Sequence, residues 1–234
     1  MKEANKESFE GTFDGELLQA IMQHSMLAHP FYQAWSGGQL SRSILGQYAK
    51  QYYAHVQAFP TYVSAVHSRC PDLSVRQRLL ENLIEEEHGH ENHPELWLRF
   101  AEGLGVARED VRNAELLPST ADSVRSLRSL TQSDDYREGL AALYAYESQI
   151  PAVARTKREG LKNFYGMDDP RMVSFFTVHE SIDVLHQQSE LEILSKKCDN
   201  SEAQARAVAA ARKAAGALLA FLDGVSEAYL SEAH

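Results

Sequence analysis

The stretch FFTVHESIDVLHQQSE, residues 175–190, decides how the rest of the chain is interpreted. It places His179, Asp183 and His186 at positions i, i+4 and i+7. Because an α-helix turns about 100° per residue, these side chains are predicted to project within roughly 60° of one another on a single helix face. A carboxylate between two imidazoles, flanked by apolar residues, is typical of half a metal site inside a helical bundle.

Helical periodicity dominates the rest of the sequence, which shows no internal repeat and no strand-like alternation. The predicted fold class is all-α, a single seven-helix bundle with short loops. We expect one domain over residues 14–232 after a flexible N-terminal segment, residues 1–13. The predicted helices cover about residues 14–27, 41–70, 74–105, 119–132, 134–166, a stretch from 170 onward, and 201–225, with Ser41, Ser74 and Ser201 at helix starts.

Three of the predicted helices contain a proline, at Pro60, Pro94 and Pro151. A proline inside a helix removes a backbone hydrogen bond and costs about 3 kcal/mol relative to alanine. Such kinks either open a cavity in the bundle or bend a helix around an ordinary core. Tyr32 falls in a predicted connector, residues 28–41, where backbone freedom would let its ring move.

The bulk composition narrows the class of protein. The 234 residues are 44% hydrophobic, enough for one well-buried domain. A net charge of −10 without a basic block disfavours nucleic acid and anionic membranes as partners. The sequence shows no signal peptide and no run of ~20 apolar residues, and Cys70 and Cys198 form no CxxC pattern. A reducing cytoplasm is the expected location.

The second half of the metal site is predicted from two other helices. Glu86 and His93 are seven residues apart, and Glu147 lies in the apolar run GLAALYAYESQIP. Together with the first stretch they provide three carboxylates and three imidazoles. This set, without thiolates, favours Fe(II) or Mn(II) in a dinuclear site over structural zinc. The spacing differs from the paired Glu-x-x-His of ferritin-like bundles.

Simpler interpretations exist for each of these residues. The charged run EEEHGHE, residues 85–91, is also what a solvated helix face looks like, and its extra imidazoles are able to bind adventitious metal. Glu147 is equally consistent with a core carboxylate paired with arginine or lysine. Asp183 is harder to explain in this way, because an unpaired buried carboxylate is costly. The three helices considered jointly favour the metal site.

Five blocks of the sequence together resemble one known group. They are HPFYQAW (29–35), QYAKQYYAHVQAFPTYVSAVHSRC (47–70), ENLIEEEHGHENHPELW (81–97), LAALYAYESQIPAVARTKREGL (140–161) and FFTVHESIDVLH (175–186). The pattern resembles the heme-oxygenase-like dimetal oxidases, which share their fold with TenA thiaminases and pyrroloquinoline-quinone synthase. It is most similar to the subfamily of the chlamydial protein associating with death domains. The death-domain association itself does not follow from these motifs.

The resemblance implies an unusual reaction. Members of this subfamily form p-aminobenzoate, a folate precursor, by cutting the ring from one of their own tyrosines in a single turnover. They use O2, an external reductant and two metal ions, Fe(II) with Fe(II) or Mn(II). The tyrosine carried over is Tyr32, the amino donor is Lys157, and Tyr48 matches a second tyrosine near the cofactor. The fold analogy also implies a homodimer.

One position departs from the pattern of the subfamily. Phe175 stands where the chlamydial member has tyrosine, so an electron-relaying hydroxyl must come from Tyr48, Tyr144, Tyr146 or another donor. A neutral amine at Lys157 requires burial, which lowers a lysine pKa. The residues alone favour Tyr32 as an aromatic anchor that packs a loop beside Phe31 and Trp35, and Lys157 as a surface lysine.

Three rival functions stay open at this point. One keeps the metals but oxidises an external molecule, by fatty-acid decarboxylation or N-oxygenation of an amine. Another is a cofactor-free enzyme of the TenA or quinone-synthase type. The third is a non-enzymatic interaction module, for which Glu86→Ala would be neutral.

Overall fold

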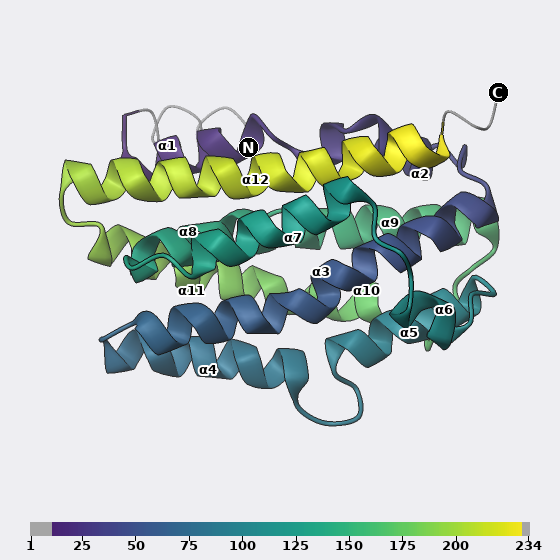
Figure 1. Ribbon diagram of the computed structural model, residues 1–234, viewed down its shortest axis with the longest axis horizontal. Coiled ribbons are helices and arrows are strands. Elements are labelled where there is room, and N and C mark those ends of the chain that lie inside the picture. The colour runs from purple at the N-terminus through teal and green to yellow at the C-terminus, as the bar shows by residue number, and fades with distance from the viewer. Residues whose placement is uncertain (1–10, 231–234) are drawn as a thin grey trace.

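The computed structural model describes residues 11–230, which form an all-helical protein without a strand (Figure 1). The described part contains twelve α-helices and one short 3₁₀ helix, so the prediction of seven helices is wrong in number. Their bounds are α1 (Phe13–Met22), η1 (Met26–Ala28), α2 (Pro30–Ser36), α3 (Arg42–Arg69), α4 (Leu73–Glu87), α5 (His93–Gly103), α6 (Arg108–Arg112), α7 (Pro118–Thr131), α8 (Tyr136–Glu147), α9 (Ile150–Tyr165), α10 (Ser174–His179), α11 (Ile182–Lys197) and α12 (Ser201–Tyr229).

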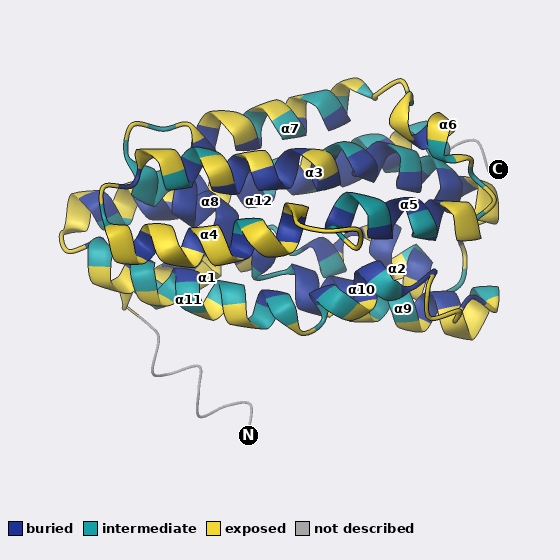
Figure 2. Ribbon diagram, turned by 90° about the horizontal axis from the view of Figure 1, so that it is seen from below, coloured by how far each residue is buried: buried dark blue, intermediate teal, exposed yellow. Residues whose placement is uncertain are grey.

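The long helix α3 runs through the bundle and is buried along more than half of its residues. It packs against α4, α5, α7 and α8, while α12 covers α7 and α8 and contacts α1. Alanines on the inner face of α12, among them Ala207, Ala211 and Ala214, are fully buried. Figure 2 shows α4 and α11 on the opposite face with many exposed residues; α4 packs inward against α3, and α11 packs inward against α8. The buried apolar side chains form one contiguous core.

Two of the five additional α-helices, α2 and α6, lie between predicted helices, and the other three arise because three predicted helices are broken, each at residues of the predicted metal site. The break between α4 and α5 covers residues 88–92, where Gly89 has a φ of +84°. Residues 148–149 separate α8 from α9, and residues 180–181 separate α10 from α11. Pro94 and Pro151 therefore lie in the first turn of a helix rather than inside one. This position is favourable because the missing N–H has no helical acceptor there. Only Pro60 is inside a helix.

Tyr32 also lies in a helix, so its prediction as part of a connector is wrong. Pro30 opens α2, and the ring of His29 caps it by accepting a hydrogen bond from Phe31 N at 3.1 Å. Asp72 and Asn200 cap α4 and α12 in place of Ser74 and Ser201, whereas Ser41 caps α3 as predicted.

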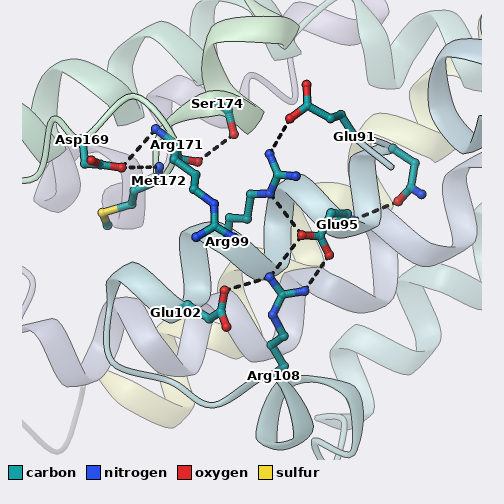
Figure 3. Close-up of polar contacts among 10 residues, drawn as sticks. Glu91, Glu95, Arg99, Glu102, Arg108, Asp169, Arg171, Met172 and Ser174 are labelled. Carbon is teal, nitrogen blue, oxygen red and sulfur yellow. Dashed lines mark hydrogen bonds and ion pairs between the residues drawn. The ribbon is translucent and has the colours of Figure 1, made fainter. Parts of the chain in front are cut away.

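An ion-pair network fixes the helix that begins with His93 (Figure 3). Arg108 on α6 donates to both Glu95 oxygens, at 2.6 and 3.1 Å, and to Glu102 at 2.8 Å. Arg99 adds hydrogen bonds to Glu95 and Glu91. Multidentate arginine–carboxylate pairs have a fixed geometry, so this network holds α5 and α6 together.

Asp169 organises the turn that precedes α10 and appears beside this network in Figure 3. Its Oδ1 accepts hydrogen bonds from the backbone N–H groups of Arg171 and Met172, both at 3.0 Å. The helix predicted to start at residue 170 begins instead at Ser174, because this turn occupies residues 170–173.

The predicted flexible segment lies mostly outside the described residues, and α1 already begins at Phe13. No helix within residues 11–230 is both long enough and apolar enough to cross a membrane.

Candidate metal centre and phenol cluster

All six side chains predicted as metal ligands lie together in the structure, in two groups of three. One group is Glu86, His93 and His179, and the other is Glu147, Asp183 and His186. Within each group the potential ligand atoms lie within 4.8 Å of one another. Such distances suit atoms that share one ion at bond lengths of about 2.0–2.3 Å.

The helix breaks bring these groups together. Glu86 and His93 lie on different helices, in the last turn of α4 and the first residue of α5. Likewise His179 ends α10, while Asp183 and His186 belong to α11. The prediction that these last three share one helix face is therefore wrong, because residues 180–181 interrupt the helix.

The first group shows unsatisfied ligand atoms. His93 Nδ1 lies 2.7 Å from Glu86 Oε2, yet this nitrogen lacks a partner in hydrogen-bond geometry. Two buried polar atoms so close without a hydrogen bond fit a shared ion better than a direct bond between them. His179 Nδ1 lies 2.6 Å from Phe175 O, and donation to this carbonyl leaves Nε2 as the ligating atom.

In the second group, Glu147 Oε1 accepts hydrogen bonds from Asn82 Nδ2 at 3.0 Å and from His186 Nδ1 at 3.1 Å. Its Oε2 is buried without a partner. These partners exclude the alternative of a Glu147 ion pair with arginine or lysine. The other ring nitrogen of His186, Nε2, lies 2.7 Å from Glu85.

Glu86 and Glu147 of this centre pair with histidines, and no lysine or arginine forms an ion pair with its carboxylates among the described residues. Burial, followed by repulsion from Glu147 and Glu86, raises the pKa of Asp183 well above 3.8. Burial also raises the pKa of Glu86, despite the neighbouring His93. Burial lowers the pKa of His186, but Glu147 and Glu85 outweigh it, so the net shift is upward. A bound cation would compensate these buried acidic groups, so the donor set fits the ions of a dimetal oxidase.

A small cavity of about 20 Å³ lies between the two groups and is lined by five of their residues, Glu86, His93, Glu147, His179 and Asp183. Two tyrosines, Tyr52 and Tyr146, line it as well. This volume has room for about one water-sized molecule.

A chain of phenols leads away from this cavity. Tyr52 and Tyr146 hydroxyls are 2.8 Å apart, and the Tyr52 ring stacks on Tyr48 with centroids 5.4 Å apart. The Tyr48 hydroxyl in turn lies 2.9 Å from that of Tyr32. Burial raises the pKa of Tyr32, Tyr48 and Tyr146 well above 10, so these phenols are protonated at neutral pH.

Lys157 on α9 contacts these phenols, and the phenol cluster is therefore defined as Tyr32, Tyr48, Tyr52, Tyr146 and Lys157. The interpretation of Lys157 as a surface lysine is wrong. Its side chain is buried, and Nζ donates a hydrogen bond to Tyr48 at 2.6 Å. Six aromatic ring centroids lie 4.6–5.9 Å from Nζ. Ring faces favour an ammonium ion, but burial without a carboxylate partner costs more, and it lowers the pKa of Lys157 well below 10.5. The amine is therefore predisposed to be neutral.

Sequence reasoning missed several residues of this site. Asn82 precedes Glu86 by one helical turn, and Glu190 follows His186 by the same interval, so helix periodicity was the available signal. Tyr52 and His55 lie on α3 beside the tyrosines already named. His55 is fully buried with both ring nitrogens unpartnered, and burial lowers its pKa to about 3.

The structure also separates the remaining candidates. Glu86 is buried, whereas Glu85, Glu87, His88 and His90 are exposed, so the solvated-face interpretation applies to its neighbours only. Tyr146 lines the cavity, but Tyr144 does not. Phe175 packs between His179 and Trp97, with centroids at 4.0 and 4.8 Å, where it offers no hydroxyl.

Comparisons with known proteins agree with this site. The family model described as iron-containing redox enzyme matches residues 46–218. The chain is 44% identical over 227 residues to the 4-aminobenzoate synthase of Nitrosomonas europaea, covering 93% of this chain and 92% of that protein. It is 42% identical over 214 residues to the 4-aminobenzoate synthase of Chlamydia muridarum, covering 90% and 89%.

Among solved structures, a TenA homologue from Pseudomonas syringae superposes with a TM-score of 0.79 at 19% identity, covering 92% of this chain and 91% of that one. This likeness shows the heme-oxygenase-like fold. The extent of the family match and the identity to the synthases show the family. The chain belongs to the family of iron-containing redox enzymes.

Proposed function

We propose that this protein forms 4-aminobenzoate (p-aminobenzoate) from its own Tyr32 in a single turnover, with Lys157 as the amino donor. Two relatives at 44% and 42% identity carry the name 4-aminobenzoate synthase, which supports the product. The bound iron, with iron or manganese beside it, would supply the reduction of O2. The six ligand candidates would hold these ions.

The arrangement of Tyr32, Tyr48 and Lys157 carries this proposal. Lys157 Nζ lies 4.9 Å from the centroid of the Tyr32 ring. Tyr48 bonds to the lysine amine and to the Tyr32 hydroxyl, and thus holds the amine and the phenol next to each other. All three side chains are at most 2% exposed. A neutral amine fixed against a phenol ring, away from water, is what transfer of nitrogen to that ring requires.

The size of the cavity favours an internal substrate over an external one. About 20 Å³ does not admit a fatty acid or an amine of similar length, but a phenol already inside the protein needs no entry space. The larger groove beside it is lined by glutamates and is unsuited to a fatty-acid carboxylate. The external-substrate alternative has no comparable support in this conformation.

Tyr52 and Tyr146 are the phenols best placed to replace the hydroxyl absent at Phe175. They line the cavity and connect through stacked and hydrogen-bonded rings to Tyr48. We assign them the transfer of electrons and protons between the cavity and Tyr32. The external reductant, the homodimer and the cytoplasmic location stay predictions.

Isotope labelling tests this function directly. The protein is produced with ring-¹³C tyrosine and side-chain-¹⁵N lysine, loaded with Fe(II) and Mn(II) without oxygen, and then exposed to O2 and a reductant. We expect 4-aminobenzoate that carries both labels, at no more than one molecule per chain. Unlabelled product, or product that requires an added small molecule, would overturn the proposal.

A further inference from the structure

A groove of about 310 Å³ opens between residues of α4 and α11, and Figure 2 shows where these two helices run. Its lining includes four carboxylates, from Glu81, Glu85, Glu190 and Glu192, and one guanidinium group, from Arg78. The excess of negative charge attracts cations and repels anionic molecules. Asn82 and His186, which both bond to Glu147, form its inner wall. The groove therefore ends at the candidate metal centre.

Glu190 gives this groove an unusual inner end. Its side chain is only 3% exposed, and neither carboxylate oxygen has a hydrogen-bond partner in the described part of the chain. It lies next to Glu147, with which it forms a hydrogen bond only if one of the two carboxyl groups is protonated, and it also interacts electrostatically with Asp183. A buried carboxylate without a partner is costly unless a cation compensates it. Glu190 nevertheless belongs to neither group of candidate ligands.

Glu85 lies at the outer end of the same groove. Its side chain is 43% exposed, and one oxygen lies 2.7 Å from His186 Nε2. It thus contacts both solvent and a candidate ligand. An ion that first binds Glu85 would free this ring nitrogen and then meet Glu190 next to the centre.

We propose that the groove between α4 and α11 is the route by which divalent metal ions enter, with Glu85 and Glu190 as a transient cation site on that route. Both residues offer hard oxygen ligands, which suit Fe(II) and Mn(II). The inference rests on the proposed metal centre, but it concerns the uptake of the ions and is separate from the reaction.

The test measures Mn(II) uptake by the metal-free protein. The uptake rate is measured after rapid mixing from the quenching of tryptophan fluorescence by Mn(II). The final number of bound ions is obtained from the electron paramagnetic resonance signal of the Mn(II) that stays free. The variants are Glu85→Gln and Glu190→Gln. Glu87→Gln is the matched control, because it removes the same charge from an exposed residue of α4 outside the groove.

We expect uptake to be about tenfold slower in Glu85→Gln and in Glu190→Gln, and unchanged in Glu87→Gln. All three variants should still bind two ions at saturation. Added salt should slow the wild type more than either Glu85→Gln or Glu190→Gln, because it screens the carboxylates.

Two results would overturn the entry route. One is uptake by both glutamine variants at the rate of the wild type. The other is loss of one bound ion at saturation in Glu190→Gln, which would make Glu190 a permanent ligand. A wild-type protein that fails to bind two ions would instead contradict the metal centre itself.

Discussion

The two parts of the candidate site differ in their access to water. The metal centre adjoins an acidic groove of about 310 Å³, and its His186 reaches the half-exposed Glu85. The phenol cluster is shielded from solvent, since Tyr32, Tyr48 and Lys157 are at most 2% exposed and surrounded by aromatic rings. An ion must enter the first part from solvent, whereas exclusion of water lowers the pKa of the amine in the second. The two parts of the site therefore need different degrees of solvent access.

The two parts also bury groups of opposite charge type, carboxylates in the metal centre and an amine in the phenol cluster. The metal centre concentrates carboxylates that lack a cation, and burial raises the pKa of Asp183 and Glu190. The phenol cluster encloses an amine that lacks an anion, and burial lowers the pKa of Lys157. Each part is thereby less stable than an apolar core of the same shape would be. The following variants test the two parts separately.

The largest expected effect is loss of the product on Tyr32→Phe. This change removes the phenol oxygen and the 2.9 Å hydrogen bond to Tyr48, but leaves the ring in place. We expect no 4-aminobenzoate above background, two bound ions as in the wild type, and a stability loss of about 1 kcal/mol. Chromatography of the reaction and metal analysis check this. Normal product from this variant would exclude Tyr32 as the substrate.

Asp183→Asn should separate stability from function in the metal centre. The carboxyl pKa is raised in the folded state, so between 3.8 and that raised pKa the folded protein binds the extra proton and stability falls as pH rises. Asparagine removes this loss and should stabilise the metal-free protein by about 1–3 kcal/mol at pH 7. Bound metal and product should both decrease.

Denaturant unfolding with and without Mn(II) measures this effect. Asp122→Asn, at an exposed ion pair of α7, is the control and should change neither quantity. Lower stability of the metal-free Asp183→Asn protein would contradict the assigned repulsion.

Lys157→Met should stabilise the protein and flatten its pH dependence. The folded-state pKa of Lys157 lies below 10.5, so between these values the unfolded chain binds the extra proton and stability is lost as pH falls. Methionine fills a similar volume without an amine and should add about 1–3 kcal/mol at pH 7, with no product. Urea unfolding between pH 6 and 10 checks this.

Lys162→Met, at an exposed position of the same helix, serves as the control. It should leave both the stability profile and the yield unchanged. An unaltered pH profile in Lys157→Met would show that the amine is charged in the folded protein.

The smallest expected change is that of Tyr52→Phe, which breaks the 2.8 Å bond to Tyr146. It should cost about 1 kcal/mol and slow product formation. Tyr62→Phe loses a similar bond on the same helix, to Val124 O at 3.0 Å, but lies outside the cavity. A similar stability loss with full product formation is expected there. Equal rates of product formation in Tyr52→Phe and Tyr62→Phe would show that Tyr52 does not transfer electrons or protons between the cavity and Tyr32.

The sequence predicted the fold class and the six ligand candidates, because side-chain types and helical spacing are local information. It did not reveal that Glu86 and His93 lie on two helices, because the polar run 85–95 also fits a solvated helix face, although Gly89 and Pro94 within it signal a break. Pro30, Pro94 and Pro151 all lie in first turns, and each marked a helix start that we did not predict. The break at residues 180–181 has no proline or glycine to indicate it.

Burial of Lys157 was even less accessible to sequence reasoning. The rings around its amine come from helices that are distant in sequence, with Tyr48 on α3, Trp97 on α5 and Phe176 on α10. Only tertiary packing unites them. The pKa of the lysine follows from that packing, so the residues alone left its role open.

The central claim is that the metal centre and the phenol cluster act together to consume Tyr32. The most direct measurement is the intact mass of the Fe(II)/Mn(II)-loaded protein before and after O2 and reductant, with peptide mapping around Tyr32. Our account predicts a mass loss confined to Tyr32 and a matching change at Lys157, both absent in Tyr32→Phe. An unchanged mass with intact tyrosines, in protein that binds two metal ions and consumes O2, would contradict it.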